Sequence, residues 1–123
     1  MEGKAGRGEY ELRDRTKQFA LRIIRLFSAL PKTEEARVLG RQLLRSGTSV
    51  AANYREASRG RTDAELVAKL GIVEQELDES LLWMELIVES NIMSESRVVE
   101  LKSECEELLR MTVAAIRTLK SRR

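Results

Sequence analysis

Apolar residues recur along most of the chain at steps of three and four residues. Between Leu12 and Leu30, for example, the stripe continues through Phe19, Ile23 and Phe27. This spacing places side chains on one face of an α-helix, because the helix completes a turn every 3.6 residues. The repeat therefore predicts a protein built from amphipathic helices.

The repeat is interrupted at three places, and the residues there are types that end and begin helices. Pro31 cannot continue a helix, whereas Gly60 and Asn91 suit helix C-termini. The residues that can cap the helix after each interruption are Thr33, Thr62 (in a capping box with Glu65) and Ser94. We expect helices at about residues 9–30, 34–59, 63–90 and 95–120.

Short connections force consecutive helices to run antiparallel. The sequence therefore predicts an all-α fold, an up-down-up-down antiparallel four-helix bundle that forms one domain over residues 9–121. Residues 1–8 are rich in glycine and charge and lack apolar spacing, so we expect them to be disordered.

The residue types present narrow the possible chemistry. With no His and one Cys, the chain lacks an intramolecular disulfide, the usual zinc ligand sets and a Glu-x-x-His di-metal site. Cys105 falls in an apolar stripe, which indicates a small core residue. A nucleophilic Ser49 would need a base that nothing in the sequence places beside it. We expect no enzymatic activity, no metal and no cofactor.

Charge and hydropathy set further expectations. No apolar run is long enough to span a bilayer, and the first residues lack the apolar segment of a signal peptide, so we expect a cytoplasmic protein without a membrane partner. Residues 1–62 carry 14 Lys/Arg and 7 Asp/Glu (+7), residues 63–107 carry 3 and 13 (−10), and residues 108–123 carry 5 and 0 (+5). This segregation predicts one basic and one acidic surface.

The predicted helix at 34–59 carries the sharpest functional signal. At 100° per residue, five arginines fall within about 80° of arc, and these are Arg37, Arg41, Arg45, Arg55 and Arg59. A line of guanidinium groups matches the phosphates along a nucleic-acid backbone better than it matches a small ligand. Two alternatives remain open: a solvated face, or ion pairs with acidic residues of segment 63–90 in a neighbouring subunit.

Two other faces of the same helix carry small or polar residues. Gly40, Gly47 and Ala51 form a small-residue face, and we favour close packing of another helix over a kink, which makes them oligomer-interface candidates. Ser46 lies at the edge of the core face. A polar face is either a buried hydrogen-bond network or solvent-exposed, and it comprises Gln42, Ser49, Asn53 and Glu56.

The predicted helix at 63–90 has more apolar surface than a monomeric bundle needs. Ile72, Trp83 and Ile87 project outside its core stripe, and Leu82 and Leu86 add to the excess. We expect this surface to be a homo-oligomer interface, because large exposed apolar patches mark contacts between proteins. Two acidic residues flank the patch and are candidates to pair with arginines across it, namely Glu76 and Glu79.

Residues 42–59, QLLRSGTSVAANYREASR, resemble the signature of the bacterial 23S rRNA-intervening sequence proteins. The signature positions here are Gln42, Leu43, Arg45, Ser46, Ser49, Val50, Asn53 and Glu56. The segment KLGIVEQELDESLLWMEL is similar to the matching family segment, with Glu76, Glu79, Ser80 and Trp83 in place.

The resemblance implies a homopentameric ring of four-helix bundles without established catalysis. It also relates the chain to the accessory variability determinant of diversity-generating retroelements, which binds a reverse transcriptase and nucleic acid through a basic surface. Two hypotheses follow. The protein is an oligomer that contacts RNA or DNA through its arginines, or it is a scaffold or reverse-transcriptase accessory subunit whose arginines contact subunits or protein partners. The acidic middle of the chain departs from strongly basic relatives and keeps protein partners open.

Overall fold

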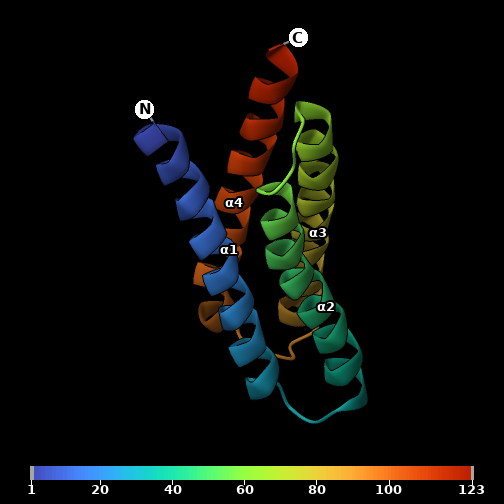
Figure 1. Ribbon diagram of the computed structural model, residues 1–123. Coiled ribbons are helices and arrows are strands. Elements are labelled where there is room, and N and C mark those ends of the chain that lie inside the picture. The colour runs from blue at the N-terminus through green and yellow to red at the C-terminus, as the bar shows by residue number, and fades with distance from the viewer. Residues whose placement is uncertain (1, 123) are drawn as a thin grey trace.

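The computed structural model describes the backbone of residues 2–122 and the side chains of residues 11–122. Within that part of the chain there are four α-helices and no strand, and the helices are α1 (Glu2–Ala29), α2 (Glu34–Ala57), α3 (Asp63–Glu89) and α4 (Glu95–Ser121). Each of α1 and α3 contacts both α2 and α4. Consecutive helices run in opposite directions, and both termini lie at the same end (Figure 1). The predicted all-α four-helix bundle is confirmed.

Hydrogen bonds at the helix ends explain where α2 and α3 begin. Thr33 Oγ1 accepts a hydrogen bond from the Ala36 amide at 3.3 Å, and Thr62 Oγ1 accepts one from the Glu65 amide at 3.1 Å. The Glu65 carboxylate accepts in return from the Arg61 amide, one residue before the cap. These bonds satisfy amides that have no partner inside the helix. Ser94 occupies the N-cap position of α4, but its side chain makes no capping hydrogen bond.

The end of α3 depends on Asn91, which adopts a left-handed conformation with φ of 65°. This conformation directs the Ile92 amide to the Ile87 carbonyl and the Asn91 amide to the Val88 carbonyl, each at 3.0 Å. Asparagine tolerates positive φ better than most residues, and the two bonds satisfy carbonyls at the helix terminus. The turn expected at Asn91 is therefore present.

The first helix begins earlier than the sequence predicts. The structure describes residues 2–8 as the first turns of α1, while Met1 lies outside the described residues. The disorder expected for residues 1–8 stays a prediction.

The apolar faces of all four helices meet in one core. Its largest fully buried side chains include Phe19, Ile23, Leu43, Val50, Val73, Leu77, Met84, Ile87, Val98 and Leu108. At the α1–α4 side, Arg15 donates two hydrogen bonds to the Glu104 carboxylate, at 2.8 and 3.0 Å. This hydrogen bond raises the pKa of Arg15 above its usual value. The core and this partly buried ion pair hold the helices that carry the candidate site.

Candidate nucleic-acid interface

The exposed arginines of α2 form the strongest candidate site. Arg37, Arg41 and Arg55 have exposed side chains, and among the described residues none of them has an ion-pair partner. Arg37 and Arg55 are separated by 18 residues, which is five complete turns and about 27 Å along a straight helix. The three side chains therefore share one side of α2 and follow its axis.

Arg45 differs from the other predicted members of the stripe, because it is paired within its own subunit. Its Nη2 lies 2.6 Å from the Glu79 carboxylate, and its Nη1 lies 3.3 Å from the Glu76 carboxylate. Sequence reasoning considered pairing with α3 of a neighbouring subunit, whereas these contacts join α2 to α3 of the same chain. The antiparallel register of the two helices brings the three side chains together.

Arg59 also departs from the predicted stripe. The helix ends at Ala57, so Arg59 lies in the turn that leads to α3 rather than on the helix face. Its side chain is exposed, and the described residues include no ion-pair partner for it. The candidate surface therefore consists of three helical arginines and one turn arginine. We call Arg37, Arg41, Arg55 and Arg59 the arginine surface.

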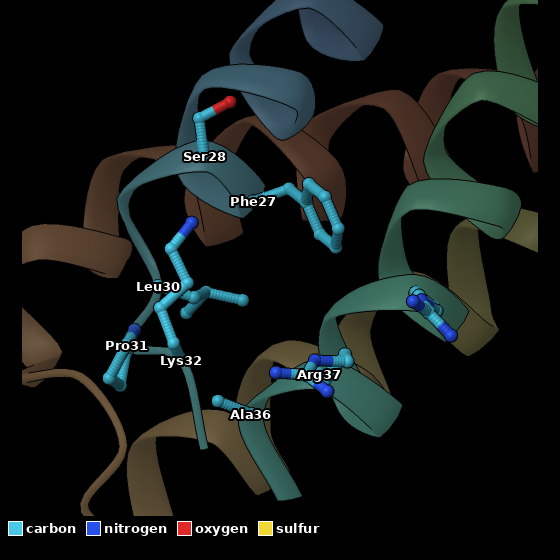
Figure 2. Close-up of a pocket in the computed structure, with 8 residues that line it drawn as sticks. Phe27, Ser28, Leu30, Pro31, Lys32, Ala36 and Arg37 are labelled. Atoms are coloured by element: carbon cyan, nitrogen blue, oxygen red, sulfur yellow. The ribbon is translucent and has the colours of Figure 1, made fainter. Parts of the chain in front are cut away.

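A groove adjoins the start of this surface, where α1 turns into α2. Its volume is about 270 Å³, and it is lined by Phe27, Ser28, Leu30, Pro31, Lys32, Ala36, Arg37 and Arg41. Figure 2 shows the Phe27 ring directed from α1 toward α2 and the Arg37 side chain directed from α2 toward the turn. Sequence reasoning missed Lys32 and Phe27 as site residues. The sequence feature that could have identified Lys32 is the short turn at Pro31, because this turn places Lys32 near the first arginines of the next helix.

The two glycines of α2 pack inside the subunit and not between subunits. A Cβ atom built on Gly40 would lie 2.7 Å from Leu30 Cδ1, and one on Gly47 would lie 2.8 Å from Ile23 Cγ1. The expected close helix packing is thus present, and its partner is α1. Because Gly40 and Gly47 are buried against α1, we withdraw them as oligomer-interface candidates. Ala51 is half-buried.

The signature serine Ser46 belongs to a buried hydrogen bond between α2 and α3. Its hydroxyl lies 2.7 Å from that of Ser80, and both residues are fully buried. Each hydroxyl also has a backbone carbonyl within reach, that of Leu43 for Ser46 and that of Glu76 for Ser80. The bond fixes the register of the two helices and leaves neither hydroxyl without a partner.

The polar face of α2 is divided between local bonds and solvent. Asn53 and Ser49 are half-buried, and Asn53 Nδ2 donates to both the Ser49 carbonyl and the Ser49 hydroxyl. Gln42 is exposed, as is Glu56, which forms an ion pair with Lys69 of α3. This face is therefore neither a single buried network nor fully solvated.

The predicted interface residues of α3 occupy different environments. Ile87 is fully buried in the core of its own subunit, so we withdraw it as an interface candidate. Ile72 and Trp83 are half-buried; the Trp83 ring packs on the core, and its indole nitrogen is buried without a partner among the described residues. Among the side chains of residues 11–122, the large apolar ones that are exposed are Ile24, Val38, Leu82, Leu86 and Val99.

Cys105 is buried in the core, as the sequence indicates. Its thiol lies 3.3 Å from the Leu77 carbonyl, and burial raises the pKa of Cys105 far above its ordinary value. The described residues contain no group of three or more His, Cys, Asp or Glu side chains arranged to hold a metal ion. None of the described helices is both long and apolar enough to cross a bilayer.

Comparison with known proteins places this arrangement in a family. The profile of the 23S rRNA-intervening sequence proteins matches residues 9–114, which includes all of α2 and α3. The chain belongs to this family. A solved structure from Bacteroides thetaiotaomicron, a protein of unknown function from the S23 ribosomal protein family, is 30% identical, with a TM-score of 0.80. The alignment covers 85% of this chain and 97% of that one. Among curated proteins, none matches significantly.

Proposed function

We propose that this protein is a non-catalytic, homo-oligomeric binding protein that contacts RNA or DNA through the arginine surface. The observation that carries the proposal is the exposure of four arginines that have no carboxylate partner among the described residues. Unpaired guanidinium groups spread over five helical turns suit successive phosphates of a polyanion, because each can form a bidentate contact with a phosphate.

The charge distribution along the chain favours binding of a polyanion on the side of the bundle that carries the arginine surface. The basic residues concentrate in the part of the chain that forms α1 and α2 and in the C-terminal half of α4, and the acidic residues in the part that forms α3 and the first half of α4. A polyanion is therefore attracted to the α1–α2 side and repelled from the acidic α3. A net charge of only +2 is compatible with this contact, because the local field depends on how the charges are distributed.

The experiment is a binding titration with a fluorescent structured RNA at constant salt. A variant with all four arginines of the surface replaced by alanine should bind at least tenfold more weakly, because each lost phosphate contact weakens the electrostatic term. A control for charge loss elsewhere removes two exposed cations of α4 that have no ion pair among the described residues, as in the Arg117→Ala/Lys120→Ala variant. Equal affinity of the fourfold variant and the wild type would overturn the proposal.

A second candidate function is a protein-interaction scaffold, including the reverse-transcriptase accessory role that the resemblance implies. The contact of Arg45 with Glu76 and Glu79 favours it, because it demonstrates arginine–carboxylate pairing on this face of α2. In that case the fourfold variant keeps its RNA affinity but loses mass by light scattering, or loses a protein partner. RNA affinity and molecular mass, measured on the same variant, separate the two functions.

The homo-oligomer, a pentamer by resemblance, is part of the proposal. Its support is apolar surface on the outside of the bundle, where Leu82 is 46% exposed and Val99 is 46% exposed. Burying such side chains against another subunit stabilises an assembly by removing apolar area from water. Trp83 is a poor probe of this interface, because it packs on the core of its own subunit.

A further inference from the structure

The groove between the end of α1 and the start of α2 combines three cations, one aromatic ring and one hydroxyl. Lys32, Arg37 and Arg41 supply the positive charge, Phe27 supplies the ring and Ser28 supplies the hydroxyl. No carboxylate is among the residues that line it. A second groove between α1 and α4 also contains three arginines, but Glu100 lines it and offsets part of their charge.

The position of Phe27 follows from the glycine beneath it. A Cβ atom on Gly40 would lie 3.1 Å from Phe27 Cδ1, so the ring rests against the backbone of α2. One side of the ring therefore packs on the protein, while the half-buried side chain leaves part of its surface facing the groove (Figure 2). The other apolar lining residues, Leu30, Pro31 and Ala36, are not aromatic.

An aromatic ring beside several cations is the arrangement that proteins use for unpaired nucleotides. Bases stack on the ring, because every base has a flat π-face, and cations contact the flanking phosphates. The groove of about 270 Å³ lies just below the range of about 300–1,000 Å³ that buries a whole drug-sized ligand. It is therefore suited to one base of a longer strand.

We propose that this groove is a subsite for one unpaired nucleotide of a bound RNA or DNA strand. The base stacks on Phe27, Lys32, Arg37 and Arg41 contact the adjacent phosphates, and the Ser28 hydroxyl is available to the sugar or a phosphate. This inference rests on the proposed function of the arginine surface. It adds that the protein prefers single-stranded segments, because a paired base cannot reach the ring.

The test measures the affinity of the full chain for three oligonucleotides of equal length: a single strand, its duplex, and a single strand with abasic sugars. Phe27→Leu removes the ring and keeps an apolar side chain against Gly40, whereas Phe27→Tyr keeps the ring. Ile24→Ala, an exposed apolar position of α1 outside the groove, is the matched control. Circular dichroism of each variant confirms that the helices are retained.

The proposal expects Phe27→Leu to bind the normal single strand roughly 5- to 100-fold more weakly, as loss of one stacked base implies. Phe27→Tyr and Ile24→Ala should bind as the wild type does, and the wild type should bind the abasic strand as weakly as Phe27→Leu binds the normal one. If Phe27→Leu does not fold, the abasic strand and Phe27→Tyr still decide the question.

Equal affinity of the wild type for normal and abasic strands would overturn the subsite. The proposed function stands in that case if the fourfold arginine variant has lost binding. The proposed function is contradicted if that variant binds all three oligonucleotides as tightly as the wild type does. The failure of the subsite and the failure of the proposed function are therefore distinguishable.

Discussion

Arg45 and Glu79 are joined by a contact of 2.6 Å between Nη2 and Oε1, across the boundary between α2 and α3. The same guanidinium contacts Glu76, so two carboxylates neutralise the arginine at the centre of the predicted stripe. One helical turn earlier, Arg41 has no such partner among the described residues. Two arginines with nearly the same orientation on one helix thus differ in their availability to a phosphate.

This difference predicts that alanine substitution of Arg45 affects mainly stability, whereas substitution of Arg41 affects mainly RNA binding. Arg45→Ala should lower the free energy of unfolding by about 1 kcal/mol, because Arg45 and Glu79 are exposed and screened by solvent although Glu76 is partly buried, whereas Arg41→Ala should leave it unchanged. Arg41→Ala should weaken RNA binding more than Arg45→Ala does. Urea denaturation and RNA titration of both variants are the measurements, and a larger loss of affinity for Arg45→Ala would contradict the assignment.

Gly47→Ala should destabilise the bundle even though alanine is the better helix former. The added Cβ would lie 2.8 to 3.2 Å from three atoms of Ile23, a fully buried side chain that cannot rotate away. Overpacking of this kind costs about 1–3 kcal/mol, more than the gain of about 1 kcal/mol in helix propensity.

The matched control is Gly71→Ala in α3, where a Cβ meets nothing within 4 Å. There we expect stabilisation of about 0.5–1 kcal/mol, because only the propensity changes. Thermal and urea unfolding measure both variants. A Gly47→Ala protein as stable as Gly71→Ala would show that α1 and α2 are not as close as described.

Cys105 should resist modification in the folded protein. Burial disfavours the thiolate, which is the reactive form, and raises the pKa of the thiol well above its usual range. At pH 8 we expect a disulfide reagent to react at the rate of unfolding, with full reaction after addition of urea. Fast reaction of the native protein at that pH would show that the core around Cys105 is open.

The apolar residues on the outside of α3 predict an effect on assembly. Leu82→Glu should lower the mass measured by light scattering while helical content is kept, because an exposed side chain contributes little to its own subunit. Val38→Glu, at an exposed apolar position of α2, tests whether the effect is confined to the α3 side of the bundle. A wild-type protein of monomer mass at micromolar concentration would contradict the homo-oligomer.

The fold followed from sequence because its determinants are local. Helical spacing and capping residues such as Thr33 and Thr62 act within a few residues, so the boundaries of α2 and α3 were predicted closely. The prediction that Ile87 lies at an oligomer interface was wrong, because α3 is apolar on several faces and periodicity alone does not choose among them.

The pairing across helices could not be predicted in the same way. That Arg45 meets carboxylates of its own chain, and that Gly47 meets Ile23, depends on the register between helices. Register results from packing of the whole core, and no local pattern specifies it. All five arginines are exposed, but their separation into paired and unpaired members depends on these contacts between helices.

The most direct test of the arginine surface is the dependence of RNA affinity on salt. The slope of log K against log salt concentration should decrease by about 0.7–0.9 for each phosphate contact removed. Arg37→Ala/Arg41→Ala and Arg117→Ala/Lys120→Ala each remove two positive charges from exposed helix positions. We predict a shallower slope for the first variant and the wild-type slope for the second. Identical slopes for both variants and the wild type would contradict it.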